Sequence, residues 1–371
     1  MMDVWNYLDA HADEALRLLI ELAQIPAPSN QEELRAKFCL RWLRSKGAEG
    51  AYIDEALNVI YPVGDNGKND LMVFMAHSDV VFPDQESLPL KIEMGRIYCP
   101  GVGDDTANAV ALLTAAGYIA EQKLSPKNCG VLLVINSGEE GLGNLKGSRK
   151  IMADFGHRVK EFVTFDGNAN AVVTRAVGSR RYRVSVKTEG GHSYARFGAP
   201  NAIAQLSQLI ARLYDVQVPD IGKTTYNVGT ISGGTSVNTI AQSAEMLYEF
   251  RSDEREGLAV IQAEFDRIVE EFRASGVCID IEVVGDRPCG LDVDNSGLAR
   301  RAAEAVREHY GFDPQFSCGS TDCNIPQSMG IPAICPGCVM GAGAHTREEY
   351  VEIDSLLPGL KVAAQLILHH F

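Results

Sequence analysis

Three strongly apolar runs in this sequence are each followed by side chains that can bind a metal ion. LMVFMA at 71–76 precedes His77, GVLLVIN at 130–136 precedes the pair Glu139 and Glu140, and EFVTF at 161–165 precedes Asp166. Near-continuous apolar runs of this length are typical of strands buried on both faces of a parallel sheet. Ligands bind at the carboxyl ends of such strands. The sequence therefore predicts an α/β fold with a functional site at one edge of its sheet.

Segments with helical spacing of apolar residues surround these strands. We expect helices over residues 3–24, 31–46, 105–123 and 296–311. Strands that alternate with helices predict a mostly parallel sheet covered by helices on both faces. A chain of 371 residues also exceeds one comfortable hydrophobic core, so two domains are expected.

The pattern changes after residue 177. RRYRVSVKT alternates polar and apolar residues, and helical segments at 201–216 and 258–275 separate strand patterns at 224–232, 244–252 and 277–285. The order β-α-β-β-α-β is that of the ferredoxin-like split unit. The sequence therefore predicts a catalytic domain formed by residues 1–177 and 288–371, with an inserted α+β domain at 178–287.

The composition excludes several classes of partner. A formal net charge of −15 argues against nucleic acid and anionic membranes as ligands. No run of about 18 apolar residues indicates a transmembrane helix, and the first residues lack the basic start of a secretory signal. Nine cysteines, an odd number, predict reduced thiols and a cytoplasmic protein. We interpret the CPGC motif of Cys335 and Cys338 as structural or incidental.

Five short segments each present a ligand where a strand ends or a tight loop begins. The ligands are His77 in MAHSDV, Asp104 in GVGDDTAN, Glu140 in NSGEEG, Asp166 in FVTFDG and His345 in GAGAHTREE. Each is weak evidence by itself, and their joint occurrence is specific. Two imidazoles and three carboxylates suit two Zn²⁺ ions better than one, because a carboxylate can bridge. A hydrolytic metalloenzyme is therefore the leading hypothesis.

Two further acids fit the same chemistry. Asp79 shares a strand face with His77 and can accept the second ring N–H of that histidine, which would fix its tautomer. Glu139 and Glu140 are adjacent at the end of a buried strand, so their side chains should point apart and have different functions. We expect Glu140 to bind a metal and Glu139 to act as general base, and then acid, on a zinc-activated water.

These motifs resemble those of the dinuclear zinc exopeptidases and amidohydrolases, which include peptidase T, succinyl-diaminopimelate desuccinylase, aminoacylase and glutamate carboxypeptidases. The resemblance covers nearly the whole chain. It implies that Asp104 bridges both ions, that His77 and Asp166 complete one site, and that Glu140 and His345 complete the other. The family often has Lys two residues after the bridging aspartate, where this chain has Thr106. That departure concerns the local hydrogen bonding and no metal ligand.

The resemblance extends to the inserted domain, which corresponds to the lid and dimerisation domain of the family. It implies that His192 of the GGHS motif reaches the site of a partner subunit and stabilises the oxyanion. It also implies that Asn238 and Arg251 hold a substrate carboxylate, a task suited to the planar guanidinium of arginine. The GSTDCNIP segment at 319–326 resembles a loop that lines the substrate pocket.

The expected protein is thus a cytoplasmic, homodimeric metallopeptidase with two Zn²⁺ ions, with Co²⁺ or Mn²⁺ as alternatives. Its favoured substrate is a short peptide, cleaved by a peptidase T-like aminopeptidase. A deacylase or desuccinylase of N-acyl amino acids and a carboxypeptidase are the alternatives within the same family, and a non-catalytic metal-binding protein is a remote one. The sequence does not decide the exact substrate, the end from which a peptide is cleaved, or the physiological metal.

Overall fold

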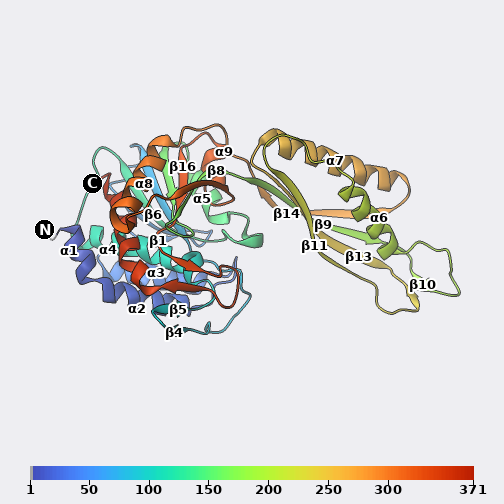
Figure 1. Cartoon of the computed structure of the whole chain (residues 1–371), viewed down its shortest axis with the longest axis horizontal. Helices are drawn as coiled ribbons and strands as arrows, with labels where there is room; N and C mark the ends of the chain where they lie inside the picture. Colours follow the sequence, from blue (N-terminus) through green and yellow to red (C-terminus); the bar gives the residue numbers. More distant parts are fainter. Residues whose placement is uncertain (1–2) are drawn as a thin grey trace. The chain divides into compact units, whose positions relative to one another are not determined.

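The computed structural model describes residues 3–371, which form two compact units (Figure 1). The first unit contains the chain as far as Ala176 and again from Leu291 to Phe371, and the second contains Val177–Gly290. Each unit has its own hydrophobic core. Among residues 3–371, no helix is both long enough and apolar enough to cross a membrane.

An eight-stranded sheet forms the centre of the first unit, in the order β1-β2-β6-β3-β7-β16-β8-β15. β3 pairs in parallel with both β6 and β7, so these three strands end at the same edge of the sheet. The expected mostly parallel sheet is confirmed. Its strands are β1 (Tyr52–Ile53), β2 (Val59–Val63), β3 (Leu71–His77), β6 (Gly130–Asn136), β7 (Val159–Thr164), β8 (Ala171–Ala176), β15 (Gln315–Gly319) and β16 (Ala333–Pro336).

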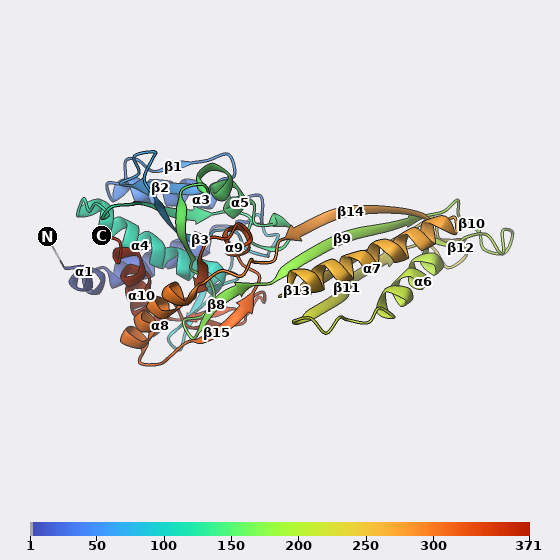
Figure 2. The same ribbon diagram turned by 90° about the horizontal axis from the view of Figure 1, so that it is seen from above.

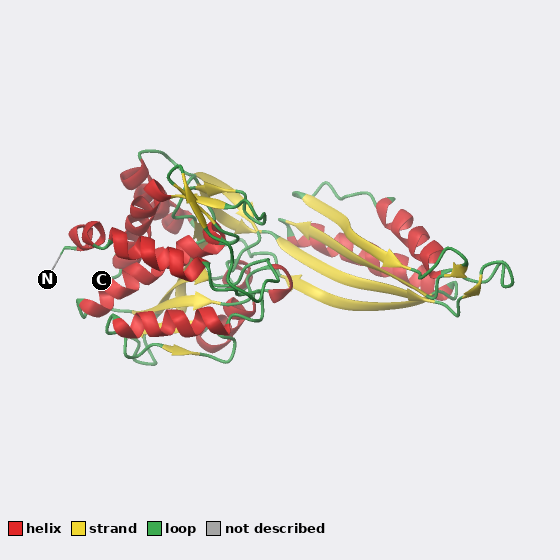
Figure 3. Cartoon of the chain, turned by 90° about the horizontal axis from the view of Figure 1, so that it is seen from below, coloured by secondary structure: helices red, strands yellow, loops and turns green. Residues whose placement is uncertain are grey.

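Helices cover both faces of this sheet (Figure 3). Successive side chains of its central strands point to opposite sides and are apolar, so both faces need to be covered. In the first unit, a hydrophobic core lies on each face of the sheet. Phe74 and Ala76 of β3 belong to the larger of these two cores, and Val73 and Met75 belong to the smaller one. The larger core contains residues of α1 (Val4–Ala10), α2 (Ala12–Ala23), α3 (Glu33–Ser45), α4 (Asn108–Glu121), α8 (Ser296–Tyr310) and α10 (Leu356–Leu368). The smaller core contains residues of α5 (Lys146–Phe155) and α9 (Asn324–Ser328).

Two of the predicted helices were wrong in their extent. The helix expected over 3–24 is broken at His11, whose backbone leaves the helical region and whose Nδ1 lies 2.7 Å from the carbonyl oxygen of Tyr7. The helix expected over 105–123 begins only at Asn108. Residues Val102–Ala107 form an irregular turn in which Asp104 and Asp105 have non-helical backbone angles. This irregularity removes both aspartates from the regular surface of a helix.

A small antiparallel sheet joins two loops of the first unit. It contains β4 (Lys91–Glu93), β5 (Arg96–Tyr98), β17 (Gly341–Ala342) and β18 (Tyr350–Glu352). Tyr350 of β18 is paired with Tyr98 of β5. This pairing places the hairpin loop at 343–349 beside the loop at 99–104.

The second unit is a four-stranded antiparallel sheet with two helices on one face (Figure 2). The strand order is β11-β13-β9-β14, which is the order of the ferredoxin-like fold, so that prediction is confirmed. A two-stranded ribbon of β10 and β12 lies apart from this sheet. The elements are β9 (Gly178–Lys187), β10 (Gly191–His192), α6 (Ala202–Tyr214), β11 (Thr224–Gly233), β12 (Thr239–Ile240), β13 (Ser243–Ser252), α7 (Arg255–Ala274) and β14 (Cys278–Arg287).

Candidate metal centre

The fold brings all five predicted ligands of the first unit together. His77 is the last residue of β3, Glu140 follows β6, Asp166 follows β7, and Asp104 and His345 come from the two loops joined by the small sheet. His345 Nε2 lies 3.0 Å from an oxygen of Glu140. Ligand atoms of His77, Asp104 and Glu140 all lie within 4.8 Å of one another, and the same holds for His77, Asp105 and Asp166.

The carboxylate of Asp104 lies between the two histidines. Its Oδ1 is 3.1 Å from His77 Nε2, and its Oδ2 is 3.1 Å from His345 Nε2. Each oxygen therefore faces a different imidazole. A carboxylate in this position can contribute one oxygen to each of two neighbouring cations.

The protonation equilibria of the cluster reflect its dense negative charge. Burial and the neighbouring charge of Asp104 raise the pKa of Asp166 to about 7. Hydrogen bonds to Asp104 and Glu140 raise the pKa of His345 to about 10. Burial opposes a charge on His77, but its hydrogen bond to Asp104 and the charges of nearby acids raise its pKa well above the usual value. The cluster thus stabilises positive charge strongly, and its imidazole and carboxylate donors suit divalent ions such as Zn²⁺.

Asp105 is a member of this cluster that the sequence analysis did not assign. It is fully buried, and its Oδ2 accepts a hydrogen bond of 2.9 Å from the backbone N–H of His77. Burial raises the pKa of Asp105 well above its usual value. The aspartate doublet was a visible signal, but which carboxylate faces the histidine rings depends on the irregular turn.

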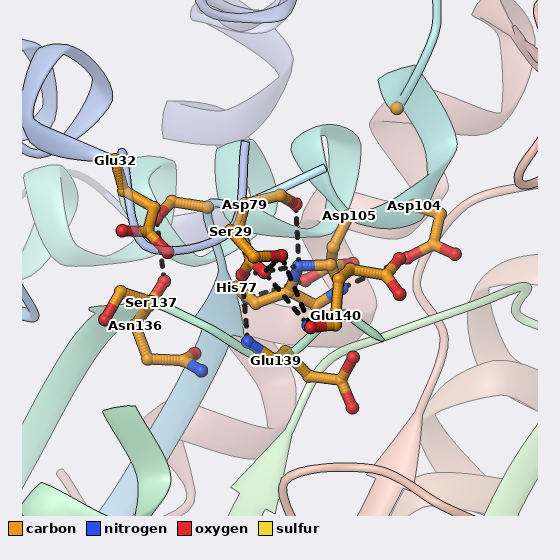
Figure 4. A network of polar contacts seen from close by, with 12 residues as sticks. Ser29, Glu32, His77, Asp79, Asp104, Asp105, Asn136, Ser137, Glu139 and Glu140 are labelled. Atoms are coloured by element: carbon orange, nitrogen blue, oxygen red, sulfur yellow. Dashed lines mark hydrogen bonds and ion pairs between the residues drawn. The ribbon is translucent and has the colours of Figure 1, made fainter. Parts of the chain in front are cut away.

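Asp79 connects the ends of two strands (Figure 4). His77 Nδ1 lies 3.0 Å from the main-chain oxygen of Asp79 and 3.5 Å from its carboxylate. The Asp79 carboxylate accepts the backbone N–H groups of Glu139 at 3.0 Å and Glu140 at 2.9 Å, and the hydroxyl of Ser29 at 2.7 Å. The Asp79 carboxylate therefore fixes the loop that carries both glutamates. The sequence analysis expected this carboxylate to be the partner of His77 Nδ1, but the nearer acceptor is the main-chain oxygen of Asp79.

Glu139 and Glu140 are both only 6% exposed. Their side chains leave the loop in different directions (Figure 4). Glu140 faces His345. Within residues 3–371, Glu139 belongs to neither of the two groups of possible metal ligands described above. The two adjacent acids thus have different surroundings, and their different functions stay a prediction.

Thr106 and the segment at 319–326 have defined surroundings. The Thr106 hydroxyl donates to the carbonyl oxygen of Gly101 and accepts a hydrogen bond of 3.1 Å from the fully buried Arg35. Residues 321–326 are buried. Asp322 in this segment accepts a hydrogen bond of 2.6 Å from the side chain of Asn136, the last residue of β6. This segment therefore supports the strand end from within the protein.

The three predicted residues of the second unit lie at two different ends of it. His192 is exposed on β10, and its neighbour Ser193 donates a backbone hydrogen bond of 3.0 Å to Asn238. Arg251 is paired with Ser179 at the end of the sheet where the chain enters the unit, and it bonds Glu249 at 3.0 Å. At about 3.3 Å per residue, the strand from Ser243 to Arg251 alone is roughly 26 Å long. One chain therefore cannot bring Asn238 and Arg251 to the same carboxylate without refolding this unit.

Glu349 is a second residue that the sequence analysis missed. Its side chain is 1% exposed, and its carboxylate accepts three backbone N–H groups from the loop that carries Asp104. Burial raises its pKa to about 7 although the three hydrogen bonds oppose this shift. Glu349 lies four residues after His345. The sequence indicates its importance only by placing an acid in a short loop that begins with small residues.

Known proteins resemble this chain in sequence and in fold. An acetylornithine deacetylase from Myxococcus xanthus is 24% identical over 346 residues, which cover 88% of this chain and 87% of the relative. The crystal structure of a tripeptidase from Staphylococcus aureus is 23% identical with a TM-score of 0.76, and the match covers 96% of this chain and 97% of that one. An aminopeptidase PepT from Bacillus cereus is 21% identical with a TM-score of 0.69, covering 96% and 98%.

The profile of the peptidase family M20/M25/M40 matches residues 73–369, which include all five of the clustered ligands. The predicted resemblance is thereby confirmed. With the ligand cluster at the carboxyl edge of its sheet, this chain belongs to the peptidase family M20/M25/M40 and is a metallopeptidase or amidohydrolase of that family.

Proposed function

We propose that this enzyme cleaves short peptides as an exopeptidase, in the manner of a peptidase T-like aminopeptidase, with two Zn²⁺ ions. The observation that carries the two-metal centre is the Asp104 carboxylate, whose two oxygens face His77 and His345 separately. The similarity to the tripeptidase and to PepT supports a short peptide as the substrate. When bound, the ions would polarise the scissile carbonyl and lower the pKa of a water molecule to about 7. Asp104 would bridge them, with His77 and Asp166 on one side and Glu140 and His345 on the other.

Glu139 is assigned as the general base and then the general acid. It is nearly buried, directly precedes the proposed ligand Glu140, and belongs to neither group of clustered ligands. It would take a proton from the attacking water and deliver it to the leaving amine. Asp79 supports this role because it holds the backbone N–H groups of Glu139 and Glu140.

The second unit supports a homodimer in which each site uses two chains. Asn238 and His192 are neighbours, whereas Arg251 lies at the other end of β13. If Asn238 and Arg251 bind the same substrate carboxylate, they come from different chains. His192 of one subunit would then stabilise the oxyanion in the site of the other. A two-fold dimer meets this requirement because its contacts are reciprocal.

The main rival is an amidohydrolase that removes the acyl group from an N-acyl amino acid. The acetylornithine deacetylase, at 24% identity, gives this reading specific support. A carboxypeptidase is the other alternative. All of these substrates carry a carboxylate, so Arg251 and Asn238 do not distinguish them. The non-catalytic alternative conflicts with membership of an enzyme family and gives Glu139 no function. The nine cysteines are free thiols, which agrees with action in a reducing compartment such as the cytoplasm.

A substrate panel tests the proposed reaction. The zinc-loaded enzyme should release the first residue of trialanine, and N-acetylation of that peptide should abolish cleavage while amidation of its carboxylate should slow it. A chelator should remove all activity, and added Zn²⁺ should restore it. Chromatography of the products identifies the bond that is cleaved. Faster hydrolysis of N-acetyl or N-succinyl amino acids would favour the deacylase, and cleavage of the last residue from the blocked peptide would favour the carboxypeptidase.

The Glu139→Gln variant should keep two metal ions and lose turnover. The amide cannot accept the proton, so we expect kcat to fall by about 10²–10⁴-fold, the usual contribution of general acid–base catalysis. Elemental analysis measures the metals, and Glu86→Gln is a control with the same change at an exposed position. Loss of one metal together with activity in excess Zn²⁺ would reverse the roles of Glu139 and Glu140.

Metal stoichiometry tests the bridge. Asp104→Ala should lose both ions, because the carboxylate contributes to each and screens their repulsion. His345→Ala and Asp166→Ala should each weaken mainly one ion. Asp354→Ala, at an exposed position, is the control and should retain both. Two tightly held ions in Asp104→Ala, measured by elemental analysis after dialysis, would refute the bridging role.

Subunit mixing tests whether His192 acts across a dimer. His192→Ala and Glu139→Ala should each be inactive, but a mixed dimer has one site with neither defect. Half of the dimers should be mixed and each should have one good site, so up to about a quarter of wild-type activity should return. His157→Ala, which changes an exposed histidine outside the second unit, should be active alone. Absence of recovery after mass spectrometry has shown exchange would rule out action in the partner site.

A further inference from the structure

Glu349 lies directly behind the loop that carries Asp104. It is the last residue of the hairpin loop between β17 and β18, and its side chain is 1% exposed. Its Oε2 accepts the backbone N–H of Gly101 at 2.8 Å. Its Oε1 accepts the N–H groups of Gly103 at 2.7 Å and of Asp104 itself at 2.8 Å. One buried carboxylate therefore satisfies three donors of a single short loop.

The loop is shaped closely around this carboxylate. Gly101 has a φ of 74°, a conformation that residues with a side chain rarely adopt. A Cβ on Gly103 would lie only 3.2 Å from Glu349 Oε1. The main chain contributes as well, because Cys99 donates a hydrogen bond of 3.1 Å to the carbonyl oxygen of Glu349. The three amide groups have little freedom to move relative to the carboxylate.

The same residue connects two ligands of the candidate centre. Glu349 holds the backbone of Asp104 through a hydrogen bond, and it belongs to the same hairpin loop as His345, four residues away. His345 Nε2 in turn lies 3.1 Å from Asp104 Oδ2. A shift of the Asp104 backbone would therefore change the distances of both carboxylate oxygens from the two imidazoles.

We infer that Glu349 is a positioning residue that holds Asp104 between two metal ions, an inference that rests on the proposed bridging role of Asp104. Groups that orient metal ligands in this way typically affect metal affinity or activity by about 10–100-fold when they are changed. Among residues 3–371, neither group of clustered ligands includes Glu349, and its carboxylate holds the backbone of Asp104, so its effect is exerted through the geometry of Asp104.

The Glu349→Gln variant tests the inference with almost no change in side-chain volume. Its amide group offers one oxygen and places N–H donors opposite N–H donors, so at least one of the three hydrogen bonds is lost. Glu349→Asp keeps the charge on a shorter side chain and should give an intermediate effect. Glu348→Gln is the matched control, because it makes the same change one residue earlier at an exposed position.

Three measurements on wild type and variants separate positioning from simple stability. They are the thermal midpoint, the metal content with the affinity of the weaker ion, and the absorption spectrum of the Co²⁺-loaded protein. We expect Glu349→Gln to fold, to bind the weaker ion about 10–100-fold less tightly, and to alter the Co²⁺ spectrum. At saturating metal, kcat should fall while KM changes little. Glu348→Gln should match the wild type in every measurement.

Several results would overturn the inference. One is a Glu349→Gln variant with wild-type metal affinity, Co²⁺ spectrum and kcat. Another is a lowered thermal midpoint as the sole change, which would mean that Glu349 serves only stability. If Glu349→Gln does not fold, a Glu349→Asp variant with wild-type spectrum and affinity decides against it. Failure of the wild type to bind two ions would instead refute the proposed function, so the two failures are distinguishable.

Discussion

The requirement to neutralise several buried carboxylates at one edge of a sheet determines much of this structure. Removing a carboxylate from water costs several kcal/mol unless a partner compensates it. Here the acids are compensated partly by two histidines and partly by backbone N–H groups. Asp104 and Glu140 face imidazoles, whereas Glu349 and, through its closest contacts, Asp79 accept backbone N–H groups. Acids that face amides are fixed supports, and acids that face imidazoles are available to cations.

This division explains why the loops around the centre are ordered without regular secondary structure. Buried N–H groups need acceptors, and in these loops carboxylates provide them. Asp79 joins the ends of β3 and β6, and Glu349 joins the turn after β5 to the hairpin before β18. The parallel strands bring the ligands to one edge, and the buried acids then fix their final geometry.

The sequence predicted the part of this arrangement that follows from local pattern. Apolar runs followed by His77, Glu140 and Asp166 located the edge of the sheet, and the alternation after residue 177 located the ferredoxin-like unit. The local pattern of the sequence did not reveal the break at His11, the burial of Asp105 or the position of Glu349. Those features depend on hydrogen bonds between residues distant in the chain, such as the bond from Gly101 to Glu349, 248 positions apart. The distance between Asn238 and Arg251 likewise follows from strand direction and register, which spacing in sequence does not give.

The contacts of Asp79 give the adjacent residues Glu139 and Glu140 different surroundings. Both backbone N–H groups bond the single carboxylate of Asp79, one to each oxygen. The peptide unit between the two residues is thereby held in one orientation, and their side chains leave it in different directions (Figure 4). Only one of them can then face His345, and that residue is Glu140. Glu139 belongs to neither group of clustered ligands described above, which agrees with the role in proton transfer proposed for it. Under the proposed assignment, the separation of ligand from base would therefore originate in Asp79, because the two glutamate side chains are chemically identical.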